Sequence, residues 1–257
     1  DRRVSGRGRE VRDVVDGLRA PDGPVRTLTR TWRFGTRISA LAHAIREGRA
    51  DDAVDLLTTP GDDEGDVIEL VTVDALEPLL LRQAIALREA AVADEPGAAL
   101  ATLEQHRLLC AHREGMAGAG YWNRRVERRL AEVAGARLGE WYVGRPILVT
   151  ENDYGLGLFN GDLGVVVPGT EGLTALVADG GQGRRLAVAR LSQVRSAHAM
   201  TVHRSQGSQV DDVTVLLPEV GSRLLTRQLL YTAVTRARTR VRVVGDVAAV
   251  AAAIDEN

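Results

Sequence analysis

The stretch TVHRSQGSQVDDVTVLLP, residues 201–218, carries the strongest fold signal in the chain. Its second half, VTVLLP (213–218), is an unbroken apolar run rich in β-branched residues, which predicts a buried strand. Its first half places a threonine, a histidine and a Ser-Gln-Gly turn directly before that strand. In an open parallel sheet, ligands bind near the ends of the strands, so this polar turn is a candidate site.

The residues that follow continue an α/β pattern. A helix is predicted over 223–237 and a second strand over 241–246. The apolar residues on one face of that helix are Leu225, Leu229, Ala233, Val234 and Ala237. A strand–helix–strand unit of this kind predicts a right-handed parallel crossover.

The preceding segment, 144–197, has a different sequence pattern. RPILVT, LGVVV, LTALVAD and RRLAVA are short strand patterns separated by turn signals, among them Asn160-Gly161 and DGGQG. Closely spaced short strands predict a small barrel inserted into the α/β domain.

Upstream, the region 51–100 begins with an acidic, glycine-containing connection, TTPGDDEGD (58–66), and the α/β pattern then continues. Val126, Leu130 and Val133 are expected on the buried face of the last helix in this region. The predicted elements are a strand at 25–28, a helix at 36–48, a strand at 67–73, a helix at 75–92, a strand at 107–112 and a helix at 121–135.

Composition excludes several classes of protein. The 257 residues contain one cysteine, Cys110, so no internal disulfide forms, and no Cys/His cluster has the spacing of a zinc site. Cys110 lies in the apolar run LLCA and is expected to be buried and inert. No signal peptide or membrane span is predicted, so the expected compartment is the cytoplasm. The net charge of −2 excludes an overall basic footprint, although a local basic surface remains open.

Three further segments place polar or glycine residues near predicted strand or helix ends. The loop REGMAGAG (113–120) follows a strand and precedes a helix, but its G-x-x-G-x-G spacing differs from the G-x-G-x-x-G of dinucleotide sites. Arg236 and Arg238 are expected in the last turn of their helix, where the helix dipole favours positive charge. Arg33, in TWRFG, is by itself an ordinary loop arginine.

Taken together and in order, these segments resemble superfamily 1 helicases. AMTVHRSQGSQVDDVTVLLP is similar to motif V, LLTRQLLYTAVTRARTRVRVVGD to motif VI, and LTRTWRFG to motif IV of that superfamily. HRLLCAHREG…WNRRVERRL and GRPILVTENDYGLGLFNGDLGVVV resemble more narrowly the RecD family, the alpha subunits of exodeoxyribonuclease V. The resemblance spans residues 26–246.

The resemblance implies a role for each motif residue. Motif V lies between the ATP cleft and the channel for single-stranded DNA in these helicases. Hydroxyl, imidazole and amide groups contact phosphates without recognising base sequence. The residues implied on the DNA side are Thr201, His203, Ser205, Gln206, Arg113, Asn152 and Asn160, with Tyr154 at a further matching position. Asn160-Gly161 is equally well explained as a hairpin turn.

On the ATP side, Arg33 and Arg236 match two arginines that reach the γ-phosphate across a domain interface. A guanidinium stabilises the charge of a transferring phosphoryl group. Gly207 and Gln209 are implied near the nucleotide. The family often has a glutamate at position 209, whereas Gln209 offers an amide oxygen instead.

The basic residues also limit what the chain does alone. All 33 are arginine, and a P-loop requires a lysine. No apolar run ends in Asp-Glu to suit a Mg²⁺ site. ATP and Mg²⁺ are therefore expected to bind mainly to a first motor domain elsewhere in the polypeptide, and this chain alone is expected not to hydrolyse ATP.

The resemblance implies four segments and a set of partners. Residues 1–24 connect to the first motor domain, 25–143 and 198–257 form a RecA-like domain, and 144–197 form an SH3-like barrel. The implied function is the C-terminal half of a 5′→3′ DNA helicase motor in double-strand break repair, with single-stranded DNA and the RecB and RecC subunits as partners. The alternatives are a stand-alone RecD-like helicase, a conjugative relaxase helicase, a non-catalytic scaffold subunit and a dinucleotide-dependent enzyme.

Overall fold

The computed structural model describes residues 35–61, 65–93, 96–180 and 183–256. Residue Arg33, the strand predicted at 25–28 and the connecting segment predicted at 1–24 lie outside the described residues.

The centre of the α/β part is a five-stranded sheet whose neighbouring strands all run parallel. Its order is β1 (Val67–Val71), β10 (Ala237–Val244), β9 (Val210–Leu216), β2 (His106–Cys110) and β8 (Ala199–Thr201). The predicted parallel pairing of the last two long strands is confirmed, with Val213 opposite Val241. Strands buried on both faces have near-continuous apolar sequences, which explains the apolar run at residues 213–218.

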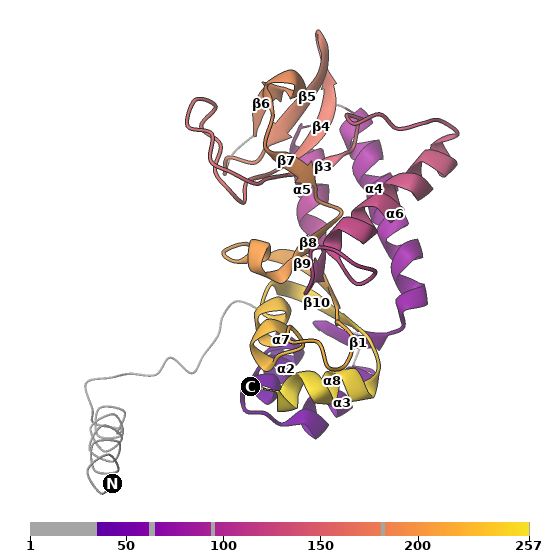
Figure 1. The fold of residues 1–257 in the computed structure, drawn as a ribbon, viewed down its shortest axis with the longest axis vertical. Coiled ribbons are helices and arrows are strands. Elements are labelled where there is room, and N and C mark those ends of the chain that lie inside the picture. Colours follow the sequence, from indigo (N-terminus) through magenta and orange to yellow (C-terminus); the bar gives the residue numbers. More distant parts are fainter. Residues whose placement is uncertain (1–34, 62–64, 94–95, 181–182, 257) are drawn as a thin grey trace, which may run out of the picture. The chain divides into compact units, whose positions relative to one another are not determined.

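Helices cover both faces of this sheet (Figure 1). One face packs against α2 (Thr36–Arg46), α3 (Ala50–Thr58), α7 (Arg227–Val234) and α8 (Val247–Asp255). The other packs against α4 (Leu76–Val92) and α6 (Ala119–Ala134). Strand β2 shows the alternation, since Leu109 enters the first core and Leu108 and Cys110 enter the second.

Residues 146–196 form a second sheet, which is antiparallel and lies in sequence between α6 and β8. Its order is β6 (Arg184–Ala187), β5 (Gly172–Val177), β4 (Leu163–Gly169), β3 (Pro146–Val149) and β7 (Val194–Ser196). Val165 and Val167 pack on α4 and α5 (Pro96–Gln105), whereas Val166 faces a separate small core. The described pairings end at β6 and β7, so they define a five-stranded sheet and do not close it into a barrel.

Several predicted boundaries were wrong for local reasons. The helix predicted at 223–237 begins at Arg227, because the Thr226 hydroxyl accepts a hydrogen bond from Leu229 N at 3.2 Å and caps it. Ala237 begins β10 instead of ending the helix. Val133 is 59% exposed, unlike Val126 and Leu130, because the end of α6 extends past the sheet core.

Other elements were missed altogether. Helix α3, which precedes the acidic connection predicted at 58–66, was not predicted; its first turn carries Asp51 and Asp52, where the helix dipole favours acidic residues. Helices α5 and α8 and the three-residue strands β7 and β8 were not predicted. Three-residue strands are too short for a period-2 pattern to show.

Gly144, where the chain enters β3, supports one prediction about stability. Its φ is +86°, and a Cβ there would lie 2.5 Å from the Cα of Arg88 on α4. We expect Gly144→Ala to lower the free energy of unfolding by about 2 kcal/mol or more, measured by urea denaturation. Gly97 in α5 has no heavy atom within 4 Å of the same test position, so Gly97→Ala should instead raise it by about 0.5–1 kcal/mol. Equal effects of the two changes would contradict the assigned backbone conformation.

Candidate functional site

The turn after β8 is built by its own hydrogen bonds. Thr201 ends β8 opposite Cys110 of β2, and the 3-10 helix η3 (Val202–Ser205) follows. The Ser205 hydroxyl donates to Val202 O at 2.7 Å, and Ser208 N donates to Ser205 O at 3.2 Å. Gly207 completes the turn with φ +88°, a conformation that favours glycine.

These bonds decide which predicted residues of the turn face solvent. His203 and Gln206 are exposed, and Thr201 is half-buried. Ser205 is 2% exposed and its hydroxyl donates within the turn, so its contact with DNA stays a prediction. Its role is to shape the turn that presents its neighbours.

A basic cleft of about 280 Å³ adjoins Thr201. It lies where the end of β8 and the loop after β2 meet strands β3 and β7 of the second sheet. Arg113 and Thr201, which the sequence placed on the same side, are both in its wall. The charged or amide side chains lining the basic cleft are Arg113, Glu114, Asn123, Arg124, Glu127, Arg145, Arg195 and Arg204.

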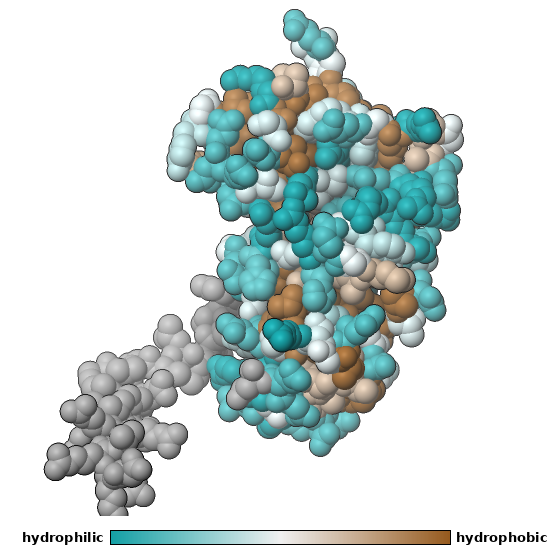
Figure 2. Space-filling view, viewed as in Figure 1, coloured by the Kyte–Doolittle hydropathy of each residue, from teal (hydrophilic) through white to brown (hydrophobic). Residues whose placement is uncertain are grey.

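Five arginines and two glutamates in this wall leave a formal excess of three positive charges (5 − 2). Glu114 lies 4.0 Å from Arg113 and 3.9 Å from Arg124, and all three side chains are exposed, so this pairing is weak. Glu127 accepts a hydrogen bond from Ser196. The basic cleft therefore attracts anions, and guanidinium groups suit phosphate in particular. On the face seen in Figure 2, hydrophilic residues prevail in the band between the two sheets.

Arg204 connects η3 to the loop 150–162 of the second sheet. Its NH1 donates to Asn160 Oδ1 at 2.8 Å, and Asn160 N donates to Asn152 Oδ1 at 2.8 Å. The two asparagines predicted on the DNA side are thus joined to each other and to the cleft wall. Gly161 has φ +103°, so the hairpin-turn explanation of Asn160-Gly161 also holds.

Arg236 lies at the opposite, amino-terminal end of the parallel strands. It follows α7 directly, and its carbonyl accepts from Val210 N at 3.0 Å, which sets Gln209 beside it. Its Nε donates to Thr232 O at 3.2 Å and its NH2 reaches Thr235 Oγ1 at 3.5 Å. No carboxylate of the described residues pairs with it. Arg238 was expected in the last turn of the helix. It lies instead on β10, where it pairs with Asp211 at 3.3 Å.

The orientation of α2 relative to α7 can be described, whereas Arg33 lies outside the described residues. Helix α2 packs against α7 through Ile38, Leu41, Leu230 and Ala233. A Cβ on Gly48, just past the end of α2, would lie 3.1 Å from the guanidinium of Arg227 at the start of α7. The two helices are therefore antiparallel, and α2 begins at the end of α7 that carries Arg236.

The glycines of the loop 113–120 are needed for the conformation of the loop backbone. Gly115 has φ +85°, and a Cβ on Gly118 would lie 2.4 Å from Glu114 O. Ala119 N donates to His112 O at 3.0 Å, which turns the chain directly into α6. The glycines thus allow a tight connection from β2 to α6. The space inside this turn is filled by the backbone of the loop itself.

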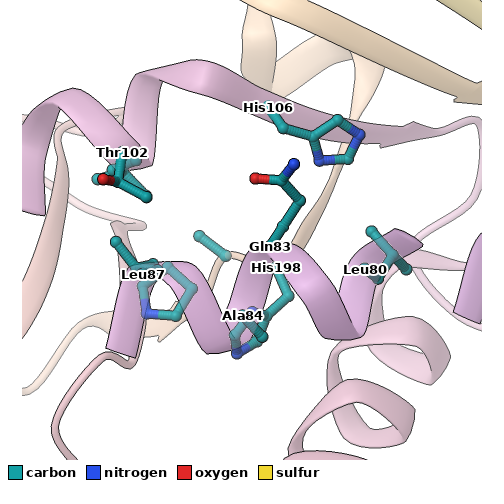
Figure 3. A pocket seen from close by; sticks show the side chains of 10 residues that line it. Leu80, Gln83, Ala84, Leu87, Thr102, His106 and His198 are labelled. Atoms are coloured by element: carbon teal, nitrogen blue, oxygen red, sulfur yellow. The ribbon is translucent and has the colours of Figure 1, made fainter. Parts of the chain in front are cut away.

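A small cavity of about 30 Å³ lies behind the cleft, between α4, α5 and the two sheets (Figure 3). His106 and His198 line it, and the amide of Gln83 points toward the ring of His106. Burial, with Arg242 and Arg107 nearby, lowers the pKa of His106 to about 3. Burial and Arg145 lower the pKa of His198 to about 3. Neutral His198 accepts from the Tyr142 hydroxyl at 2.9 Å, and burial raises the pKa of that hydroxyl.

Cys110 is fully buried, and burial raises the pKa of its thiol, which confirms the expectation of an inert cysteine. Within the described ranges, no group of three His, Cys, Asp or Glu side chains is arranged to hold a metal ion. In the same ranges no helix has the length and apolarity needed to cross a membrane.

Sequence reasoning missed most of the cleft arginines. Arg124, Arg145, Arg195 and Arg204 come from four separate segments, and only folding brings them together. The arginine-rich run NRRVERR (123–129) supplies one of them, Arg124, whereas Arg125 and Arg129 pair with Glu77. Asn123 was also missed: its side chain bonds both Ala199 N and Ala199 O at 2.9 Å and fixes β8 against α6.

Comparison with known proteins adds a family match. Residues 196–244 match the family described as the UvrD-like helicase C-terminal domain. A protein of Mycolicibacterium smegmatis, named RecBCD enzyme subunit RecD, is 53% identical over 252 residues, which are 96% of this chain and 44% of that protein. The ATP-dependent RecD2 DNA helicase of Deinococcus radiodurans is 41% identical over 102 residues, 40% of this chain and 14% of that protein.

A Pif1 helicase from Bacteroides, solved with ADP-AlF3 and single-stranded DNA, is 16% identical, with 86% of this chain and 54% of that chain covered. Its TM-score of 0.43 is too low to support an argument. The chain spans less than half the length of the RecD relative that it matches.

Proposed function

Since the chain belongs to the RecD family of superfamily 1 helicases and corresponds to the C-terminal helicase domain, we propose that it is the second half of an ATP-driven DNA motor. In this proposal the motor moves 5′→3′ along single-stranded DNA as a subunit of the RecBCD helicase–nuclease, beside RecB and RecC, in double-strand break repair. The parallel sheet is the RecA-like domain, formed by residues 25–143 and 198–257. Residues 144–197 are its insertion, residues 1–24 connect it to the first motor domain, and the compartment is the cytoplasm.

The observation that carries the proposal is the turn from Thr201 to Gln209. One end of it borders the basic cleft at the carboxyl ends of the parallel strands, and the other lies beside Arg236 at the amino ends of β9 and β10. The turn therefore connects the region proposed to bind the nucleotide with the region proposed to bind DNA, so a movement of one can be transmitted to the other along the chain. The Ser205 hydrogen bond keeps that path rigid.

On the DNA side, we propose that the basic cleft holds the sugar-phosphate backbone. Arg113, Arg195 and Arg204 supply charge without base recognition, which suits an enzyme that moves along any sequence. Thr201, His203 and Gln206 add hydrogen bonds from the turn, and Asn152 and Asn160 add them from the second sheet.

On the nucleotide side, Arg236 fits the task of contacting a phosphate because its guanidinium holds only weak, neutral contacts. Gln209 precedes Val210, which bonds the Arg236 carbonyl, and we propose that Gln209 and Gly207 contact the nucleotide. Arg33 is proposed as a second arginine, from the segment that leads into α2. ATP, with Mg²⁺ held by the rest of the polypeptide, supplies the energy of the step.

The insertion is proposed to be an SH3-like barrel. The strand order, with β7 beside β3, and the short 3-10 helix η2 (Val188–Arg190) before β7 support this proposal, although the described pairings form an open sheet. A stand-alone RecD-like helicase remains the second candidate, favoured by the 41% identity to the Deinococcus protein. A scaffold role would leave the cleft arginines without a purpose.

Binding of single-stranded DNA tests the proposal. We expect the chain to bind a fluorescent oligothymidylate with an affinity that falls with salt. Arg113→Ala and Arg195→Ala should each weaken binding several-fold and reduce the slope of log K against log[salt] by about 0.7. Arg46→Ala is the matched control, since Arg46 is exposed on α2 and pairs locally with Glu47. No binding, or an equal loss with the control, would contradict the cleft assignment.

A further inference from the structure

The loop 150–162 exposes two aromatic side chains that the fold does not use. Tyr154 is 79% exposed and Phe159 is 53% exposed, although a buried aromatic ring would stabilise the chain by about 2 kcal/mol. Their rings meet edge to face, with centroids 6.4 Å apart and an interplanar angle of 80°. This geometry leaves ring faces open to solvent.

The rest of the loop is held firmly. Leu158 is buried in the small core of the second sheet and anchors the loop there. Asp153 and Leu158 exchange backbone hydrogen bonds at 2.8 Å, Phe159 N donates to Asp162 Oδ2 at 2.8 Å, and Arg184 donates to Gly157 O at 2.8 Å. The aromatic pair is therefore preorganised, because the loop that carries it is held by these contacts.

The loop is also connected to the basic cleft. Asn152 Nδ2 contacts the Tyr154 hydroxyl at 3.2 Å, Asn152 Oδ1 accepts from Asn160 N, and Asn160 Oδ1 accepts from Arg204, which lines the cleft. An aromatic face one short hydrogen-bond chain away from a phosphate-binding arginine is the arrangement by which proteins hold unpaired nucleic-acid strands.

We propose that Tyr154 and Phe159 form a stacking platform for an unpaired base of the strand whose backbone occupies the basic cleft. The inference rests on the proposed DNA-binding function and extends it from phosphate contact to base contact. Every base has an aromatic face, so such a platform grips the strand without sequence preference. Asn152, Asn160 and Arg204 position the platform relative to the cleft.

The test compares two oligonucleotides of equal length on the same 257-residue chain: oligothymidylate and an abasic sugar-phosphate strand. The wild-type chain should prefer the strand with bases. The double change Tyr154→Ala/Phe159→Ala should weaken oligothymidylate binding about tenfold, toward the abasic value, and leave abasic binding and the salt slope unchanged. Tyr154→Phe and Phe159→Tyr keep the rings and should retain the preference.

Val133→Ala, which removes another exposed apolar side chain on α6, is the matched control and should have no effect. If the double variant binds oligothymidylate like the wild type, or loses affinity for both strands equally, the stacking proposal is wrong. The first outcome would leave the aromatic pair as a surface for a protein partner. If the wild type binds neither strand, the DNA-binding proposal itself fails, which distinguishes the two.

Discussion

Arg236→Ala is expected to lower the rate of ATP hydrolysis about 1,000-fold in the polypeptide that carries both motor halves. An arginine that contacts the transferring phosphoryl group contributes roughly 10³–10⁵ to the rate of such reactions. The change should cost little stability, because Arg236 makes only neutral hydrogen bonds to Thr232 and Thr235 among the described residues. The loss should appear in kcat, measured by steady-state phosphate release with saturating single-stranded DNA, with a smaller change in KM.

Two further variants separate charge from geometry. Arg236→Lys keeps the charge but not the two-pronged donor, so we expect it to recover only part of the rate. Arg238→Ala removes an arginine two residues away that is paired with Asp211, and it should retain nearly wild-type turnover. Comparable losses of turnover for Arg236→Ala and Arg238→Ala would mean that the overall positive charge at the start of β10 matters, and not a specific contact from the Arg236 guanidinium.

Acid is expected to destabilise this fold steeply through His106 and His198. Their pKa values are lowered to about 3 in the folded chain, against about 6.5 when unfolded. Between these values the unfolded chain binds more protons than the folded one, so stability is complete above about pH 6.5 and falls as the pH drops toward 3. The expected loss is at most about 1.4 kcal/mol per pH unit for each imidazole, since both side chains keep some solvent access.

Urea unfolding at several pH values between 7 and 4 measures this slope. His198→Gln keeps an acceptor for the Tyr142 hydroxyl and cannot take up a proton, so it should remove about half of the effect of the pair. His203→Gln, at an exposed imidazole, is the matched control and should leave the slope as it is. A slope that is the same in all three proteins would show that carboxylates, and not these histidines, set the acid limit.

The strong sequence signals predicted the parallel sheet, whereas short elements escaped. Helix α4 was predicted at 75–92 and lies at Leu76–Val92; strand β9 was predicted at 213–218 and lies at Val210–Leu216, so the element was found but its bounds were shifted. Strand β8 is three residues long and is defined by pairing with β2, which lies about 90 residues earlier in the chain. Such a strand forms because of tertiary contacts, so no local sequence pattern predicts it.

The candidate site divides in the same way. Thr201, Arg113, Asn152 and Asn160 follow from motif positions, and the structure places them at or beside one cleft. The buried turn contact of Ser205 was not predicted, because a hydroxyl looks the same in sequence whether it faces solvent or closes a turn. Arg195 and Arg204 were missed because the cleft is formed where the inserted second sheet meets the parallel sheet, a contact that no local pattern predicts.

The most direct test of the central claim is a structure of the complete two-domain polypeptide bound to single-stranded DNA and an ATP transition-state analogue. Our account predicts the Arg236 guanidinium within hydrogen-bond distance, about 3 Å, of the γ-phosphate position, and the DNA backbone in the cleft that contains Arg113 and Thr201. It would be contradicted if Arg236 stayed on the Thr232 carbonyl, away from the nucleotide, with the motor domains closed around both ligands.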